Sequence, residues 1–258
     1  MISNLIKFLM RKILLYGKIR NLYCVIRAFY FCKIKNYMQN YKDISKDTWK
    51  KTLDSNRRAV CDIGIDLPAH PRSNKFLNVG LSIGGGKSNW LLEVVKSKYE
   101  AKNFKNLKVL SVGPRSEGEI FNLFANGFEF KNIVGIDLFS YSPLIKLSDM
   151  HDMKVGNDQF DLVLMGWCLA YSNNKKKAIE EAKRVLKKNG MLVIGYTLTQ
   201  RSDDDILSER GYLVRSPNNK INSKKDLDML LNSCGLQEFY SKEINKGTSS
   251  RLLYGATF

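Results

Sequence analysis

The chain has 258 residues, an apolar content of 44% and a net charge of +17. This length has room for one large α/β domain plus an appendage, and the apolar content is ordinary for a protein that buries a core. The five cysteines form no CxxC pair and only two histidines are present, which argues against a zinc site or a disulfide framework. We therefore predict no bound metal, and reduced thiols in a cytosolic protein.

Residues 1–42 contain nine basic residues and no acid, and apolar and basic positions are interleaved along them. The segment predicts either a helical cap packed on the domain or an amphipathic basic helix lying on an anionic membrane surface. An RNA-binding arm is a third alternative. No uncharged run approaches the roughly 18–20 apolar residues of a membrane-spanning helix. The charges at Lys7, Arg11 and Lys12 argue against a signal peptide.

Residues 43–75 are polar and contain Pro68 and Pro71, which predicts a connector with one short helix over residues 47–58. His70 has no partner nearby in the sequence, and we expect it at the surface. We place the domain boundary after residue 75: residues 1–75 form the basic helical extension and connector, and residues 76–258 form the main domain.

The run from Gly84 to Ser88 reads Gly-Gly-Gly-Lys-Ser and resembles part of a phosphate-binding loop. The full pattern needs a glycine at the position that Leu81 occupies, so we do not predict nucleotide hydrolysis. The simpler interpretation is a glycine turn before a helix over residues 89–100, whose apolar positions recur at helical spacing.

Four short apolar runs, over residues 109–112, 133–136, 160–165 and 191–195, alternate with turns and helical patterns. This order predicts parallel strands joined by crossovers, in a sheet covered on both faces. Ligands of such sheets bind at the carboxyl ends of the strands. Gly113, Asp137 and Asp149 follow strands or their connections, so we expect them at that edge.

The last third of the chain predicts a polar loop, a helix and two closing strands. Residues 197–223 are polar and irregular, and residues 223–234 show a capped helical pattern. Residues 237–244 and 251–258 alternate as an antiparallel strand pair would.

From Val109 onward, the order of these features resembles the class I S-adenosylmethionine-dependent methyltransferases, in particular the small Rossmann-like group often called type 11. The best match starts at Asp149-Met150-His151-Asp152-Met153, continues through Phe160-Asp161-Leu162-Val163 and ends in the helix and strand of residues 178–195. The resemblance covers residues 105–258. It implies an α/β Rossmann-like three-layer sandwich with a mostly parallel seven-stranded sheet and an antiparallel last strand, to which the basic helical extension is added.

The resemblance also implies a site for S-adenosylmethionine. Gly113 would let the ligand approach the backbone, and Asp137 could accept two hydrogen bonds from the ribose diol, unless it only caps a helix or is solvated. Asp149 could accept from the adenine amine while the Met150 N–H meets a ring nitrogen. Asp161 is expected to have a structural role at the start of its strand.

The turn after the first strand departs from the family pattern of acid-x-Gly-x-Gly-x-Gly. Those positions hold Ser111, Gly113, Arg115 and Glu117, so only the first glycine is present. Arg115 could pair with the methionine carboxylate of the cofactor, and Glu117 or Glu119 with its ammonium. The alternative is a turn that no longer admits the cofactor. The dinucleotide pattern G-x-G-x-x-G is absent, which argues against an NAD enzyme.

Residues 166–172 would face the transferred methyl group. Methyl transfer to a good nucleophile needs mainly in-line positioning and exclusion of water. If a base takes part, His151 and Tyr171 are the candidates; the alternative is that both are pocket walls.

The sequence thus predicts a cytoplasmic S-adenosylmethionine-dependent methyltransferase for a small-molecule or glycan-type acceptor. If residues 1–42 lie on anionic lipid instead of only capping the domain, the protein is peripheral on the inner face of the membrane. Nucleic acid is the less favoured partner. The alternatives are an RNA methyltransferase or a non-catalytic, methyltransferase-like binding or scaffold protein.

Overall fold

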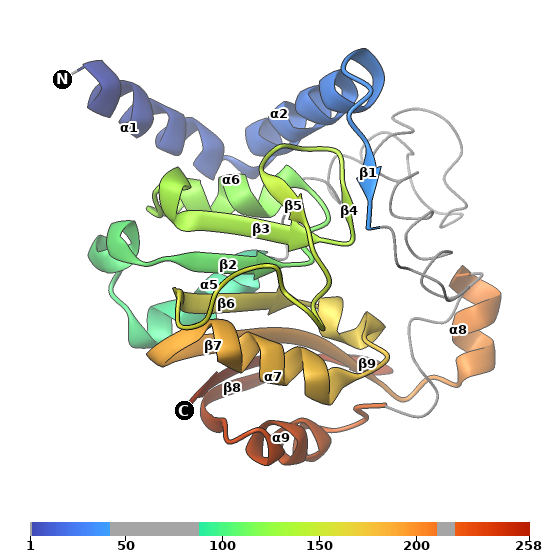
Figure 1. The fold of residues 1–258 in the computed structure, drawn as a ribbon. Helices are drawn as coiled ribbons and strands as arrows, with labels where there is room; N and C mark the ends of the chain where they lie inside the picture. The colour runs from blue at the N-terminus through green and yellow to red at the C-terminus, as the bar shows by residue number, and fades with distance from the viewer. Residues whose placement is uncertain (1, 42–87, 211–219) are drawn as a thin grey trace.

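A computed structural model describes residues 2–41, 88–210 and 220–258. The predicted connector with its helix over residues 47–58, His70, the domain boundary after residue 75 and the glycines of the run 84–87 lie outside the described residues. The described part is an α/β sandwich with a helical hairpin at one end (Figure 1).

The centre of the fold is a seven-stranded sheet in the order β5-β3-β2-β6-β7-β9-β8. Its strands are β2 (Val109–Val112), β3 (Ile133–Asp137), β5 (Ile145–Leu147), β6 (Phe160–Gly166), β7 (Leu186–Thr199), β8 (Gln237–Lys246) and β9 (Ser249–Thr257). β2, β3, β5, β6 and β7 pair in parallel, and β9 runs antiparallel to both β7 and β8. The predicted topology and the antiparallel last strand are confirmed.

Helices cover both faces of this sheet, as its apolar strands require. α5 (Ser88–Lys98) and α6 (Glu117–Ala125) pack on one face; α7 (Lys175–Val185) and α9 (Lys224–Ser233) pack on the other. Side chains along β6 alternate between the two faces of the sheet. Leu162 and Leu164 pack in the core with α5 and α6, and Val163 and Met165 pack in the core with α7 and α9. α8 (Asp203–Arg210) follows β7.

One strand boundary and one strand between the parallel strands were not predicted from the sequence. β7 begins at Leu186, directly after α7, rather than after the turn at Asn189; the backbone at Asn189 is left-handed, and the pairing with β6 shifts register between Phe160 and Leu162. Between β3 and β5 the chain forms no helix but a short strand, β4 (Phe139–Ser140), which belongs to a separate two-stranded sheet.

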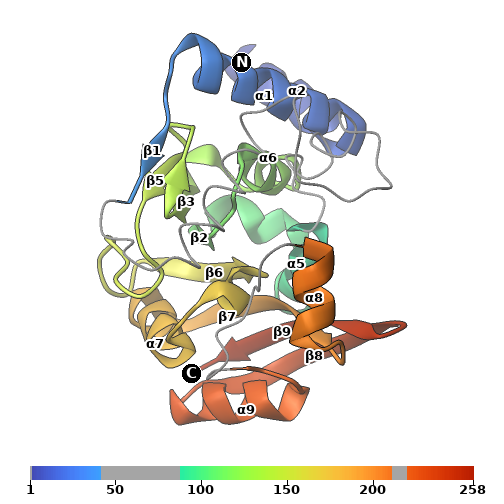
Figure 2. The same cartoon turned by 90° about the vertical axis from the view of Figure 1, so that its right-hand side faces the viewer.

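The N-terminal segment consists of α1 (Ile2–Leu15), α2 (Gly17–Phe29), a π-helical turn (Tyr30–Ile34) and β1 (Gln39–Asn40). α1 and α2 form a hairpin that lies over α6, at the opposite end of the molecule from α9 (Figures 1 and 2). β1 pairs antiparallel with β4, so the segment is also tied to the main domain through its backbone. The helical cap predicted for residues 1–42 is therefore present.

Asp161 lies at the start of β6, away from the carboxyl ends of the strands. Its carboxylate accepts from the Lys108 backbone N–H at 2.8 Å and from Lys187 Nζ at 2.8 and 2.9 Å. These contacts confirm the predicted structural role of Asp161.

Candidate functional site

The turn after β2 brings three of the predicted residues together. The Gly113 amide donates to the Ile136 carbonyl at 2.8 Å, and the Arg115 amide donates to Asp137 Oδ2 at 3.0 Å. Gly113 has a φ of +65°, and a β carbon there would lie 2.6 Å from Cys168 Cβ, so only glycine fits. Arg115 is left-handed as well, with a φ of +58°, at a position where the family pattern has glycine.

Asp137 is the last residue of β3, at the edge of the sheet where the parallel strands have their carboxyl ends. Its carboxylate accepts backbone hydrogen bonds from Arg115 and, at 3.4 Å, from Phe139, while its carbonyl accepts from the Ser148 amide at 3.0 Å. Burial raises the pKa of Asp137 to about 6, against the lowering effect of these backbone hydrogen bonds. The ends of β2, β3 and β5 are therefore joined through this one residue.

Glu117, the first residue of α6, is fully buried and already paired. Arg27 of α2 binds its carboxylate through Nε at 2.5 Å and Nη2 at 2.8 Å, and the Ser142 hydroxyl donates to it as well. The Glu117 amide donates to the Tyr141 hydroxyl at 3.0 Å. The carboxylate that we predicted for a cofactor ammonium thus has a cation from the hairpin. No local pattern indicates this pairing, which joins segments 90 residues apart.

Glu119, one half-turn further along α6, is buried but only partly satisfied. The Ser111 hydroxyl donates to its Oε1, and its Oε2 makes no hydrogen bond to a described residue. Burial raises the pKa of Glu119 to about 7; the charge of Asp137 adds to this, and the Ser111 hydrogen bond opposes it. Ser111 was the signal in the sequence for this contact, because the family pattern has an acid at that position. Here the carboxylate beside Ser111 is that of Glu119, and it comes from α6 instead of from β2.

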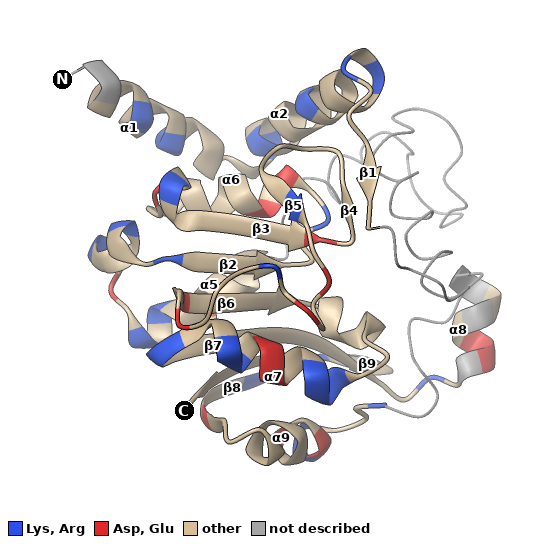
Figure 3. Cartoon of the chain, in the orientation of Figure 1, with Lys and Arg blue, Asp and Glu red and all other residues tan. Residues whose placement is uncertain are grey.

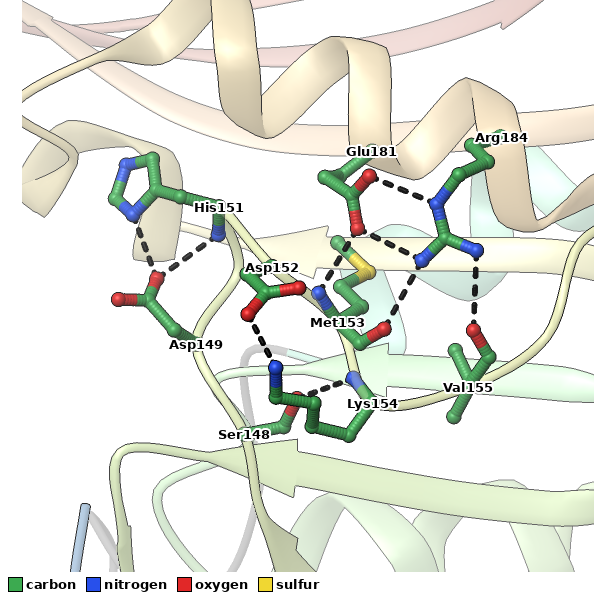
Figure 4. A network of polar contacts seen from close by, with 9 residues as sticks. All are labelled: Ser148, Asp149, His151, Asp152, Met153, Lys154, Val155, Glu181 and Arg184. Atoms are coloured by element: carbon green, nitrogen blue, oxygen red, sulfur yellow. Dashed lines mark hydrogen bonds and ion pairs between the residues drawn. The ribbon is translucent and has the colours of Figure 1, made fainter. Parts of the chain in front are cut away.

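Asp149 and Met150 follow β5, with Met150 buried. Asp149 Oδ1 accepts from the His151 amide at 2.8 Å and from His151 Nδ1 at 2.6 Å (Figure 4). Burial raises the pKa of Asp149, but the hydrogen bonds from His151 outweigh it and the net direction is downward. Its Oδ2 has no hydrogen bond among the described residues, so one carboxylate oxygen is left for a ligand.

The loop that carries Asp149 is fastened to α7. The Met153 amide donates to Glu181 Oε2 at 2.9 Å, and Arg184 donates to the carbonyls of Met153 at 2.9 Å and Val155 at 3.0 Å (Figure 4). The Lys154 amide donates back to the Ser148 hydroxyl at 2.9 Å. Arg184 belongs to the Arg-Val-Leu sequence of the predicted helix, and the structure shows that it holds this loop.

The two candidate bases lie in different surroundings. His151 is held at both ring nitrogens, by Asp149 at Nδ1 and by the Ser172 hydroxyl, which is 2.7 Å from Nε2. Tyr171 is half-buried in the 3₁₀ turn Cys168–Tyr171 that follows β6. Sequence reasoning did not single out Ser172, whose buried hydroxyl fixes the orientation of the imidazole.

Part of the chain is similar to known proteins. Residues 110–194 match a family model described as a methyltransferase domain. An uncharacterized protein of Methanocaldococcus jannaschii is 37% identical over 82 residues, which are 28% of this chain and 38% of that protein. The chain thus spans well under half the length of this relative.

Among solved structures, the MccD protein superimposes with a TM-score of 0.51 at 15% identity, over 65% of this chain and 95% of that one. A Burkholderia thailandensis 1,6-didemethyltoxoflavin-N1-methyltransferase, with bound S-adenosylhomocysteine, has a TM-score of 0.49 at 12% identity, over 67% and 78% of the two chains.

The sheet order and its single antiparallel strand are those of a Rossmann-like α/β sandwich, a fold that the MccD protein shares. Residues 110–194 resemble the methyltransferase domain of the matched family model, in the region where the motifs after Val109 predicted it.

Proposed function

We propose that the protein is a methyltransferase that uses S-adenosylmethionine and acts on a small-molecule or glycan-type acceptor. One observation carries the proposal: Asp137, Asp149, Glu119 and Arg115 come from four segments to one edge of the sheet, although only Gly113 remains of the glycine pattern. The family match over residues 110–194 supports the same reaction.

The residues present fit the parts of S-adenosylmethionine. Asp137 would accept from the ribose diol, because an ionised carboxylate has acceptor sites beyond the two that backbone amides use here. Asp149 Oδ2 would accept from the adenine amine. The Arg115 guanidinium has no ion pair with a described residue, and it would bind the methionine carboxylate.

For the methionine ammonium we assign Glu119 rather than Glu117. The Glu117 carboxylate is neutralised by Arg27, whereas Glu119 keeps one oxygen without a hydrogen bond in the described structure. A carboxylate buried in this state is costly, and a bound cation removes that cost. Glu119 would thereby replace the acid that the family pattern has at the position of Ser111.

S-adenosylmethionine, when bound, supplies an electrophilic methyl group on a sulfonium. The residues after β6 would form the wall of the acceptor side, where close positioning and exclusion of water contribute most. An acceptor that must lose a proton could give it to His151 Nε2, since Asp149 holds the other ring nitrogen as the donor. The path would include the Ser172 hydroxyl.

A non-catalytic binding or scaffold protein is the second candidate. The observation that favours it is the turn itself, in which Arg115 and Glu117 replace two glycines and Glu117 is bound to the N-terminal hairpin. This candidate predicts that no S-adenosylmethionine binds.

The test is calorimetric titration with S-adenosylmethionine, S-adenosylhomocysteine and 5′-methylthioadenosine, which has the adenosine but no amino-acid group. Micromolar binding of the first two, about −8 kcal/mol, would support the proposal. Asp137→Asn should weaken all three ligands, whereas Glu119→Gln should weaken only the two that carry the ammonium, by about 10- to 100-fold for one charge-assisted hydrogen bond. Asp152→Asn, exposed in the Asp149 loop and paired with Lys154, is the matched control and should bind normally.

Absence of binding up to millimolar concentration would refute the enzyme and favour the scaffold. If Glu119→Gln weakened the binding of methylthioadenosine as much as that of the two ligands with an ammonium group, Glu119 would not be the partner of the ammonium. The proposed cofactor site itself would remain.

A further inference from the structure

The N-terminal hairpin carries most of the exposed large apolar side chains of the described structure. Fifteen of the eighteen lie between residues 5 and 38, and nearly all are more than two-fifths exposed. They are Leu5, Ile6, Phe8, Leu9, Met10, Ile13, Leu15, Tyr16, Ile19, Leu22, Ile26, Phe29, Tyr30, Ile34 and Met38. Exposed patches of this kind mark interaction surfaces in folded proteins.

The exposed positions follow a helical stripe, so they form a face rather than scattered sites. Along α2, Ile19, Leu22, Ile26 and Phe29 recur at intervals of three and four residues, which places them on one side of the helix. The buried residues of α2, such as Cys24, lie on the other side against the domain. The hairpin is therefore apolar on both its inner and its outer face.

The basic residues of the hairpin divide between the same two faces. The three arginines point inward: Arg11 binds Glu129 at 2.6 Å, Arg20 donates to the Leu14 carbonyl at 3.1 Å, and Arg27 binds Glu117.

The lysines at positions 7, 12, 18, 33 and 35 are exposed, and Figure 3 shows basic but no acidic residues along α1 and α2. Lys7 also binds Glu129, at 3.1 Å. Lys7 and the arginines thus fasten the hairpin, while the other four lysines lie among the exposed apolar side chains.

We propose that this surface, which covers residues 4–38 of the hairpin and of the segment that follows it, docks on an anionic lipid membrane. Exposed aliphatic and aromatic side chains would enter the boundary between headgroups and acyl chains, and the surrounding lysines would lie against lipid phosphates. No helix among the described residues is long and apolar enough to span a membrane. Docking in the plane of the interface needs no such helix.

Charge complementarity favours lipid over the other occupants. A second copy of the chain would bring the four exposed lysines at positions 12, 18, 33 and 35 against four identical ones, and no acid of the hairpin would offset them. Nucleic acid would satisfy the lysines, but it would leave a face made mainly of Leu and Ile without apolar partners. Docking does not depend on cofactor binding, so it can fail or succeed independently of the proposed function.

The first experiment measures sedimentation of the full chain with vesicles of phosphatidylcholine, alone or with roughly a third phosphatidylserine. Binding should appear only with the anionic lipid and should weaken as salt rises. Lys12→Gln with Lys18→Gln should weaken it about 25-fold, or about fivefold for each lysine. The matched pair, Lys96→Gln with Lys188→Gln, removes the same charge from α5 and β7, where both lysines are exposed, and should change binding less than twofold on the same scale.

The second experiment separates apolar insertion from simple charge attraction. Ile26 and Met229 are 58% and 55% exposed, so Ile26→Asp and Met229→Asp perturb the fold to a similar small extent. Only Ile26→Asp should abolish vesicle binding, with unchanged thermal unfolding for both variants.

Failure to bind anionic vesicles, or equal losses in the matched variants, would overturn the proposal. Dimerisation in the absence of lipid that Ile26→Asp abolishes would also overturn it and assign the face to a second copy.

Discussion

Replacing Glu119 by glutamine removes a buried ionisable group while keeping the size of the side chain and its hydrogen bond from Ser111. The carboxylate is nearly inaccessible to solvent and has only that one hydrogen bond within the described structure. We therefore expect the ionised form to destabilise the ligand-free protein and the variant to relieve this effect.

The magnitude follows from the pKa of Glu119, which burial raises from 4.5 to about 7. The folded state then holds this proton more tightly than the unfolded state. Its contribution to stability is complete below pH 4.5 and is lost as the pH rises through 7. The difference between the two pKa values corresponds to about 3 kcal/mol of unfolding free energy, at about 1.4 kcal/mol per pH unit.

Glutamine does not titrate, but its amide N–H groups gain no partner, at a cost of about 1–2 kcal/mol. Glu119→Gln should therefore be slightly less stable than the wild type near pH 4.5 and about 1–2 kcal/mol more stable above pH 8. The stability difference between the variant and the wild type should therefore change by about 3 kcal/mol between pH 4.5 and pH 8, and this change is the quantity to measure. Asp137, whose pKa is also raised, titrates in both proteins, and its charge raises the pKa of Glu119, so the measured difference includes the loss of this coupling.

The assay is urea unfolding of the ligand-free protein, followed by circular dichroism across that pH range. Glu180→Gln, an exposed acid on α7, is the control and should leave the pH dependence unchanged. If wild type and Glu119→Gln lose stability in parallel as the pH rises, the carboxylate is solvated and the reasoning about its role is wrong.

Three further perturbations test the elements around the site. Gly113→Ala should cost about 2–3 kcal/mol in chemical unfolding, because its β carbon would overlap the turn after β6; Gly247→Ala, equally left-handed but with open space around it, should cost only about 1 kcal/mol. Arg27→Ala leaves a buried carboxylate of α6 without its cation and should lower the unfolding free energy by about 3 kcal/mol; a loss below roughly 1 kcal/mol would mean that solvent replaces the arginine. Arg184→Lys should loosen the Asp149 loop and weaken methylthioadenosine binding several-fold in calorimetry, with little change in thermal unfolding; unaltered affinity would show that α7 does not position the loop.

The fold was predictable because its signals are local. The parallel strands β2, β3, β6 and β7 each contain an apolar run that is visible in the sequence, whereas the short β5 does not. The alternation expected of the final strand is not found, because β9 lies between β7 and β8 and is buried over residues 252–256. The capped helix before β8 also has a local signature: Ser223 and Asp226 form a reciprocal capping box. Boundaries were less predictable. β7 starts five residues earlier than its apolar run, because pairing with β6 extends the strand through a polar segment.

The site was predictable only where the strand ends determine it. Gly113, Asp137 and Asp149 follow from topology, since carboxyl ends of parallel strands share an edge. The partner of Glu117 could not be predicted, because Arg27 lies in a segment whose helical pattern gives no information about which face of the domain it covers. A pairing across 90 residues is fixed by tertiary packing, which no local pattern records.

The two glutamates at the start of α6 show how the chain treats two buried charges differently. Both gain from the positive end of the helix dipole, and both are enclosed. Glu117 receives a bidentate arginine and a hydroxyl donor, so its charge is compensated within the protein.

Glu119 receives one hydroxyl donor and lies near a second acid, Asp137, which increases the cost of its charge. A structural role would be served as well by a neutral side chain that costs nothing to bury. An acid that destabilises the ligand-free protein fits a site for a cation that the described residues do not supply, and in the proposed function the ammonium of S-adenosylmethionine would carry that charge.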